Sequence, residues 1–305
     1  MTPFLLKPFF LKPLPSQRPR VHATAKSFLY LVIVACSVGW NPLGHSTTWS
    51  QARTEVEFEV QEDYIYGRKD GMALTLDVVR PAEPNGIGLC FMVSGGWNSM
   101  WFPPRQFVRD SLYQSLLKSG YTLFLVRHGS APRYKVPEAV DDVRLAIKKI
   151  RDQAANFGVD PNKLGAFGGS AGGHLSIMLG TTGVENQRVA AVAAYFPPTN
   201  LNGYVDDPKF RADFPALVFD RALVDPMSPE LQATSDDAPI LMIHGDQDTL
   251  VPLVHSEKLK AKLDEQSVAN ELIVIENAGH AFTGDDKKRA EQALLAWFDK
   301  HLRGL

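Results

Sequence analysis

The sequence predicts an α/β fold with a mostly parallel central sheet and helices on both faces. Apolar runs of strand length alternate along the chain with segments whose apolar residues recur at helical spacing, which is the order typical of such folds. One run, residues 164–167, leads through Gly168-Gly169-Ser170-Ala171-Gly172 into a second apolar segment. Glycines on both sides of a serine are typical of a sharp turn from a buried strand into a helix, because they keep Cβ atoms out of the turn.

The first 52 residues differ from the rest in charge. They carry five basic residues and no acidic one, and an apolar run at residues 28–40 is followed by small and polar residues that end in Ser50-Gln51-Ala52. This pattern indicates a secretory signal peptide, and the apolar run is short for a bilayer span. We therefore expect a leader at residues 1–52, export to the periplasm or the exterior, and a mature domain at residues 53–305.

Two alternatives remain for this leader. The segment Ile33-Val34-Ala35-Cys36 resembles the lipobox of bacterial lipoproteins, which would make Cys36 a lipid anchor. The leader could also be an uncleaved anchor, or the start of the chain could be misassigned. Only through such an anchor do we expect contact with a membrane.

Composition agrees with one catalytic domain. Hydrophobic residues make up 45% of the 305 positions, enough for a single large core, and a formal net charge of −2 gives no reason to expect nucleic acid as a partner. Removal of the leader would leave only Cys90, inside a predicted strand. We expect Cys90 to be a small buried hydrophobe, with no internal disulfide.

The elements are predicted in order along the mature chain. Alternating apolar and polar residues predict two half-exposed antiparallel strands, at residues 56–60 and 74–78. Continuous apolar runs predict buried strands at residues 88–93, 164–167 and 240–244, and further strands are predicted at residues 123–126, 189–196 and 271–275. Helical spacing predicts helices at residues 107–119, 137–150, 174–180 and 253–265.

Three polar residues follow predicted strands in the order nucleophile, acid, base. Ser170 follows the run at residues 164–167, Asp248 follows residues 240–244, and His280 follows residues 271–275. Open parallel sheets gather their active sites at the carboxyl ends of the strands. The pattern predicts that the three side chains meet there.

These motifs resemble those of the α/β-hydrolase superfamily of serine esterases and peptidases. The likeness covers residues 66–301 and rests on the segments at residues 74–81, 93–97, 168–172, 244–252 and 279–280. It is greatest to small esterases and lipase-like enzymes, hormone-sensitive-lipase-like and feruloyl-esterase-like proteins among them. The resemblance implies an α/β-hydrolase fold and a Ser-His-Asp triad, with His280 taking the proton of Ser170 and Asp248 orienting His280.

The same resemblance suggests how an oxyanion would be held. The N–H of Ala171, at the start of a helix, supplies one donor. The second should come from the loop after the strand at residues 88–93, where relatives carry His-Gly-Gly-Gly. This chain has Val93-Ser94-Gly95-Gly96-Trp97, which lacks the histidine and one glycine, so that either Gly95 or Gly96 could donate.

Between residues 197 and 237 the alternation of strands and helices breaks down. The segment holds six prolines and four aromatic residues and shows no clear secondary structure. A stretch of this length is usually functional or disordered, and its aromatic content argues against disorder. We expect a small cap over the pocket, as in related hydrolases; the alternative is a surface insertion that packs on the sheet.

Several other residues compete for roles in the site. Asp246 is the rival acid, but the family places its acid three residues before Val251-Pro252, which favours Asp248. His174 and His244 are interpreted as structural, and His128 as structural or as part of a pocket. No cluster of His, Cys or carboxylate residues has metal-ligand spacing, so we expect neither a metal nor a cofactor.

The resemblance therefore implies an exported serine esterase that acts on carboxylic esters of modest size, with acyl groups on plant or algal polysaccharides as one candidate class. A peptidase related to prolyl oligopeptidases is the alternative, since those enzymes share the triad. A non-catalytic binding protein with this fold is a third hypothesis, which the retained Ser170, Asp248 and His280 disfavour.

Overall fold

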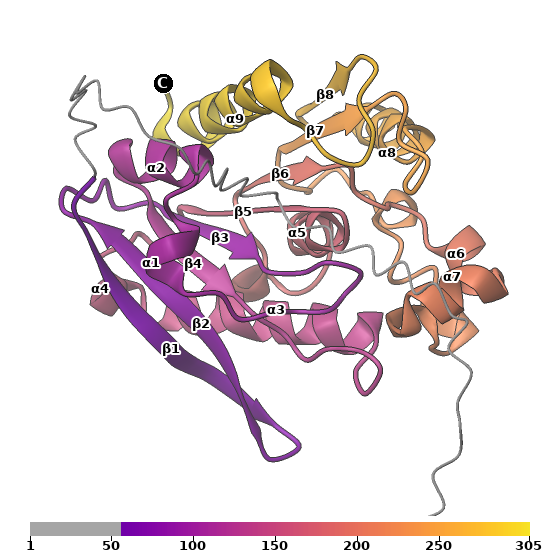
Figure 1. Ribbon diagram of the computed structural model, residues 1–305, viewed down its shortest axis with the longest axis horizontal. Coiled ribbons are helices and arrows are strands. Elements are labelled where there is room, and N and C mark those ends of the chain that lie inside the picture. Colours follow the sequence, from indigo (N-terminus) through magenta and orange to yellow (C-terminus); the bar gives the residue numbers. More distant parts are fainter. Residues whose placement is uncertain (1–55) are drawn as a thin grey trace, which may run out of the picture. The chain divides into compact units, whose positions relative to one another are not determined.

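Eight strands form one sheet in the part of the chain that the computed structural model describes, residues 56–305 (Figure 1). Their order across the sheet is β1-β2-β4-β3-β5-β6-β7-β8. The strands are β1 (Phe58–Lys69), β2 (Met72–Pro81), β3 (Gly88–Met92), β4 (Thr122–Val126), β5 (Leu164–Gly169), β6 (Ala191–Tyr195), β7 (Ile240–Gly245) and β8 (Asn270–Ile275). The leader predicted at residues 1–52, with Cys36, lies outside the described residues.

The sheet is parallel except at one edge. β1 pairs with β2 and β2 pairs with β4 in antiparallel fashion, whereas β4, β3, β5, β6, β7 and β8 are parallel to their neighbours. Phe91 of β3 lies opposite Leu125 of β4 and Phe167 of β5, so the carboxyl ends of these strands reach the same edge. The predicted fold class is confirmed, including the antiparallel strands that open the domain.

Helices cover both faces of the sheet. Apolar side chains of α3 (Val136–Asp152), α5 (Ala171–Thr181) and α8 (Val254–Glu265) join one buried cluster, and those of α2 (Ser111–Lys118) and α9 (Gly284–Phe298) join a second. Successive strand residues point to opposite faces, so Leu89 of β3 belongs to the second cluster and its neighbour Cys90 to the first.

Cys90 is fully buried, and this burial raises the pKa of its thiol. Both facts agree with its interpretation as a small hydrophobe in a central strand. A further short helix, α4 (Ala154–Phe157), follows α3 and contributes to the same cluster as Cys90.

The helix predicted at residues 107–119 is wrong in its first turn. The structure has α1 (Pro104–Phe107), then an interruption, and then α2. Asp110 is extended and its side chain accepts a hydrogen bond from the backbone N–H of Leu112 at 3.1 Å, so it caps a new helix that begins at Ser111. The helix α9, which carries Leu294, Trp297 and Phe298 into the core, was not predicted from the sequence.

The segment at residues 197–237 contains more regular structure than expected. It forms α6 (Asn202–Asp206), α7 (Pro208–Asp213) and three short 3-10 helices, η2 (Pro215–Leu217), η3 (Arg221–Leu223) and η4 (Pro229–Leu231). Pro208, Pro215 and Pro229 each stand in the first turn of one of these pieces, where a missing N–H costs nothing. The many prolines therefore start short helices here, and no long helix can form.

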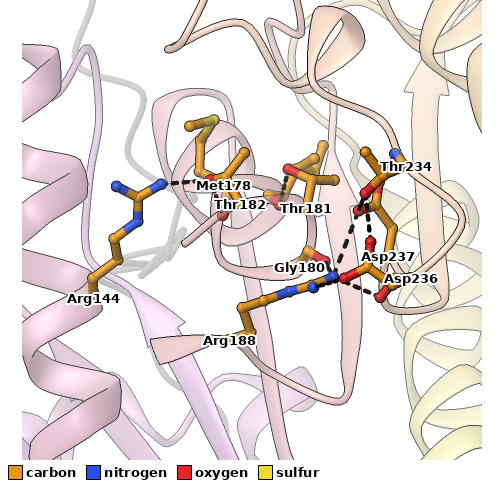
Figure 2. A network of polar contacts seen from close by, with 10 residues as sticks. Arg144, Met178, Gly180, Thr181, Thr182, Arg188, Thr234, Asp236 and Asp237 are labelled. Atoms are coloured by element: carbon orange, nitrogen blue, oxygen red, sulfur yellow. Dashed lines mark hydrogen bonds and ion pairs between the residues drawn. The ribbon is translucent and has the colours of Figure 1, made fainter. Parts of the chain in front are cut away.

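The far end of this segment is tied to the sheet domain by Arg188, just before β6. Figure 2 shows its guanidinium between the end of α5 and the turn at residues 234–237. It donates to the carbonyl oxygens of Gly180 at 3.0 Å and Asp236 at 2.7 Å, and to the carboxylate of Asp236 at 2.5 Å. The segment is thus fixed at the point where it leads into β7.

Within residues 56–305, no helix combines the length and the apolar character that a bilayer span requires.

Candidate active site

Ser170 occupies a strained turn between β5 and α5. Its backbone has φ 54° and ψ −122°, a conformation that L residues rarely adopt, and its N–H donates to the carbonyl oxygen of Tyr195 at 2.9 Å. A Cβ on Gly168 would lie 2.7 Å from the backbone of Gly172, and a Cβ on Gly172 would lie 2.6 Å from the carbonyl oxygen of Met92. Both glycines are required, because backbone atoms pack so closely at this turn that a Cβ atom would clash with them.

Asp248 and His280 form the second part of the site. The Nδ1–H of His280 donates to Oδ2 of Asp248 at 2.6 Å, and the other carboxylate oxygen accepts the backbone N–H groups of Leu250 and Val251, each at 2.9 Å. The loops after β7 and β8 supply these residues, as the strand order predicts. Three hydrogen bonds fix the carboxylate, and the carboxylate fixes the imidazole tautomer.

The charge of Asp248 is stabilised although the residue is 5% exposed. Burial alone would raise the pKa of this carboxyl, but the polar contacts with His244 and His280 outweigh burial and hold the pKa well below its ordinary value. His244 Nε2 lies 3.5 Å from the carboxylate and donates mainly to the carbonyl oxygen of Val251 at 2.8 Å, while its Nδ1 accepts from the hydroxyl of Ser256 at 2.7 Å. His244 is a structural residue that also holds this loop, in agreement with its interpretation.

The free nitrogen of His280 is buried without a hydrogen bond to any described residue. Its ring packs against Phe196, with ring centroids 4.4 Å apart. The same phenylalanine ring lies 3.2 Å from the Cβ position of Gly169, the residue directly before Ser170. Phe196 therefore contacts both the imidazole and the strand end that carries the serine. Sequence reasoning missed Phe196, although it follows β6 directly and shares the positive φ of Ser170.

The two glycines of the predicted oxyanion loop differ in their hydrogen bonds. Gly95 donates its N–H to the carbonyl oxygen of Asn98 at 2.9 Å and accepts in return from the N–H of Asn98 at 3.0 Å. This closes a turn whose two central residues, Gly96 and Trp97, both have φ 56°. Neither Gly96 N–H nor Ala171 N–H bonds to another described residue. Gly96 is thus better placed than Gly95 to serve as a donor alongside Ala171.

His174 of α5 supports this turn. Its Nδ1 accepts from Nε1–H of Trp97 at 3.2 Å, and its Nε2–H donates to the carbonyl oxygen of Met227 at 2.8 Å. Burial lowers the pKa of His174 to about 4, so the neutral imidazole that this arrangement requires is present at neutral pH. One structural histidine thereby joins the glycine-rich turn, the helix after Ser170 and the 197–237 segment.

A small pocket lies against Ser170. It holds about 30 Å³ and is partly open to solvent. Its lining combines Ser170 with the turn and with the 197–237 segment, namely Gly96, Trp97, Pro198, Tyr204, Phe210, Phe214 and Leu217, and adds Leu250 and Val251 from the acid loop. The pocket is almost wholly apolar. Gly96 and Phe214 are in close contact, because a Cβ on Gly96 would lie 2.7 Å from the ring of Phe214.

Two further histidines lie near the site. His128 is buried, with Nδ1 donating to the carbonyl oxygen of Gly129 and Nε2 accepting from the hydroxyl of Ser94, both at 2.8 Å. It braces the glycine-rich loop and lines a second cavity. His255, which the sequence analysis missed, bonds to the hydroxyl of Tyr204 at 2.9 Å, and burial lowers its pKa to about 4.

The chain resembles known proteins both in sequence and in fold. The sequence profile of the BD-FAE family matches residues 76–263. Among solved structures, a truncated form of a carbohydrate esterase from gut microbiota superimposes with a TM-score of 0.66 at 24% identity, covering 82% of this chain and 99% of that one. This likeness shows the fold.

Two curated relatives match with low identity. The esterase LipQ of Mycobacterium tuberculosis is 26% identical over 189 residues, 56% of this chain and 45% of LipQ. The uncharacterized peptidase YuxL of Bacillus subtilis is 25% identical over 274 residues, 81% of this chain and 40% of YuxL. The chain thus spans less than half the length of either relative.

Proposed function

The chain belongs to the BD-FAE family of α/β-hydrolase esterases, and we propose that it hydrolyses short-chain carboxylic esters through an acyl-enzyme formed on Ser170. The family membership confirms the resemblance inferred from the sequence. Membership of the family supports ester hydrolysis, and the chemistry of the site supports the roles that we propose for the individual residues.

In the proposed mechanism, Oγ of Ser170 attacks the ester carbonyl carbon as Nε2 of His280 takes the hydroxyl proton. The carbonyl oxygen becomes an oxyanion, which the N–H groups of Ala171 and Gly96 stabilise. The bond to the alcohol then breaks, and His280 returns the proton to the departing oxygen. Water repeats the sequence on the acyl-enzyme, releases the carboxylic acid and restores Ser170.

One observation carries the proposal: the hydrogen bond of 2.6 Å between Asp248 and His280. It holds the protonated nitrogen of the imidazole against the carboxylate, so that the other nitrogen is an acceptor. That acceptor is buried and makes no hydrogen bond within residues 56–305. A base in this state is ready to take a proton from a neighbouring hydroxyl.

The pocket supports a preference for short acyl chains. The pocket beside Ser170 holds only about 30 Å³, which favours small acyl groups, and aromatic residues of the 197–237 segment form part of its wall. A bulky aromatic acyl group would have to displace Phe214, which packs on Gly96. We therefore propose acetate and similarly small acids as the acyl products, with the segment acting as the cap.

Export is a further part of the proposal. It is supported by the order of basic residues, an apolar run and small residues within the first 52 positions of the sequence. A lipid anchor at Cys36 is the alternative form of the same proposal.

The test is Ser170→Ala, assayed on p-nitrophenyl acetate, a long-chain p-nitrophenyl ester and an aminoacyl p-nitroanilide. We expect the wild type to prefer the acetate, and the variant to lose roughly a millionfold in kcat while its circular dichroism and thermal unfolding stay unchanged. The anilide addresses the second candidate, a peptidase, which the match to YuxL favours. A variant that kept a tenth of the wild-type rate would exclude Ser170 as the nucleophile.

A further inference from the structure

Phe196 stands directly after β6, at the carboxyl edge of the sheet, and the mechanism above gives it no role. β6 lies between β5, which leads to Ser170, and β7, which leads to Asp248 (Figure 1). Phe196 is 8% exposed, and its φ of 37° is rare for a residue that has a side chain. Strained backbone of this kind costs free energy and is common at functional sites, which points to a use for the ring that it holds.

Backbone hydrogen bonds fix this turn to the strands that lead to the nucleophile and the acid. The carbonyl oxygen of Tyr195, one residue earlier, accepts the N–H of Ser170 at 2.9 Å. The N–H of Phe196 donates to the carbonyl oxygen of Ile243 in β7 at 2.8 Å. Its ring also lies 3.2 Å from the Cβ position of Gly169. The ring therefore has a fixed place relative to both strands.

The imidazole of His280 needs such a fixed neighbour. Within residues 56–305, Asp248 is its only hydrogen-bond partner. One hydrogen bond at Nδ1 fixes the tautomer, but it leaves the ring free to turn about the line that joins the two groups, and such a turn moves Nε2. A displacement on the order of 1 Å can slow a catalytic step about a hundredfold.

Phe196 supplies the second contact that the imidazole requires. The centroids of the two rings are 4.4 Å apart, and their planes are inclined by 47°. Phe282, two residues after His280, packs edge-to-face against the same phenyl ring, with centroids 5.4 Å apart. One ring thus contacts both the imidazole and the loop that carries it.

This contact becomes stronger as the reaction proceeds. The imidazole of His280 is neutral before the reaction and becomes positively charged when it takes the proton of Ser170. The face of a phenyl ring carries negative charge density and attracts a cation within about 6 Å of its centroid. An attraction that is stronger in the transition state than in the ground state lowers the barrier, whereas an equal attraction in both states does not.

We propose that Phe196 is a positioning residue that acts through His280. Its ring keeps Nε2 of the imidazole directed at the hydroxyl of Ser170 and stabilises the imidazolium that forms when the proton is transferred. The proposal rests on the proposed esterase mechanism and adds to it a residue that prepares the base without reacting itself.

The first test is Phe196→Leu in the full chain, with steady-state kinetics on p-nitrophenyl acetate. We expect kcat to fall roughly tenfold to a hundredfold, because both steps of the reaction need the imidazole in place. KM should stay within about twofold, since Phe196 does not line the pocket beside Ser170. Phe196→Met, a flexible side chain that can refill the space, should show the same fall because it has no flat ring.

Phe157→Leu is the matched control. Phe157 is 5% exposed, and its ring packs against those of Tyr64 and Phe124. Both leucine variants lose a buried ring, so both should unfold at a lower temperature than the wild type. Only Phe196→Leu should also lose kcat.

Trifluoroacetone tests the contact in an adduct that resembles the tetrahedral intermediate. Oγ of Ser170 adds to the carbonyl carbon of this inhibitor, the hydroxyl proton passes to His280, and the carbonyl oxygen becomes an oxyanion. Its inhibition constant should rise in Phe196→Leu by the same factor by which kcat/KM falls. In Phe157→Leu the inhibition constant should stay unchanged.

A double-mutant cycle tests whether Phe196 acts through His280. Once His280→Ala has removed the imidazole, Phe196→Leu should slow the residual hydrolysis by less than about twofold. An undiminished effect in that background, or equal losses of kcat in Phe196→Leu and Phe157→Leu, would overturn the proposal. If Ser170→Ala kept its activity, the esterase mechanism itself would fail. An inactive Ser170→Ala beside a fully active Phe196→Leu would overturn only the role of Phe196.

Discussion

At the scale of single residues, two acids that stand two positions apart perform different tasks. Asp248 receives the Nδ1–H of His280, whereas Asp246 accepts the backbone N–H of Asn277 at 2.7 Å, three residues before His280. Asn277 has φ 59°, and this hydrogen bond stabilises its turn. Asp248 thus acts on the imidazole itself, and Asp246 shapes the loop that carries the imidazole.

This division gives a matched pair of variants. Asp248→Asn should lower kcat on p-nitrophenyl acetate by roughly ten-thousandfold, because an amide that donates to Nδ1 favours the wrong tautomer. Asp246→Asn keeps an oxygen that can accept from Asn277 and should lower kcat far less. Steady-state kinetics with both purified variants gives the comparison, and the opposite ranking would assign the acid to Asp246.

His174 predicts how stability depends on pH. In the folded chain burial lowers its pKa to about 4, whereas in the unfolded chain the pKa is about 6.5. Between these values the unfolded state binds more protons, so the contribution of His174 to stability is complete above pH 6.5 and is lost as the pH falls towards 4. The loss at the acid end is up to about 3 kcal/mol.

His174→Gln tests this dependence, because an amide can accept from Trp97 and donate to Met227 without titrating. Urea unfolding at neutral pH and near pH 4.5 should show a smaller loss of unfolding free energy for the variant than for the wild type. His128 and His255, whose pKa values burial also lowers, contribute equally to both proteins and cancel in the difference. Equal losses in the two proteins would show that His174 does not change its protonation in this range.

At the scale of elements, the strand-to-helix turn around Ser170 sets the geometry of the site. Gly172→Ala would place a Cβ 2.6 Å from the carbonyl oxygen of Met92, a backbone atom that cannot move without shifting β3. We expect a loss of about 1–3 kcal/mol in unfolding free energy and a lower kcat. Gly203→Ala in α6 is the control, since nothing lies within 4 Å of its Cβ position. Chemical denaturation of both variants measures the difference, and an unchanged Gly172→Ala protein would show that the turn has room.

The elements that the sequence predicted well are those with a strong apolar pattern. The strands β3 to β8 and the helices α3, α5 and α8 appear within a few residues of their predicted bounds. The error at residues 107–119 arose because apolar spacing continues through Asp110, while the capping hydrogen bond that separates α1 from α2 depends on the conformation of one side chain. The short helices of the 197–237 segment were missed because each is shorter than the window over which helical spacing can be recognised.

At the scale of the whole domain, the site is assembled from loops that are distant in sequence. Phe214 of the 197–237 segment packs against Gly96 and lines the pocket beside Ser170. Phe214→Ala should enlarge this pocket, so the ratio of kcat/KM for p-nitrophenyl hexanoate to that for the acetate should rise by roughly tenfold. Phe219→Ala, in the same segment but outside the lining, is the control. Equal changes for both esters would mean that Phe214 does not limit acyl length.

The sequence by itself determined the sheet, the turn at Ser170 and the order in which Ser170, Asp248 and His280 follow their strands. These features depend on the local periodicity of apolar residues and on steric contacts between residues close in sequence. Both can be recognised from consecutive residues. It also indicated the family, because the spacing within each motif is a local property.

Only the tertiary structure decided what lies between the motifs. The contact of Phe196 with His280 and the bridge from Trp97 through His174 to Met227 join residues from segments far apart in the sequence. The same holds for the cavity around Trp101, which β1, β2 and the loops after β3 and β4 build together. No spacing rule contains such contacts, because they depend on how side chains from separate strands pack at one edge of the sheet.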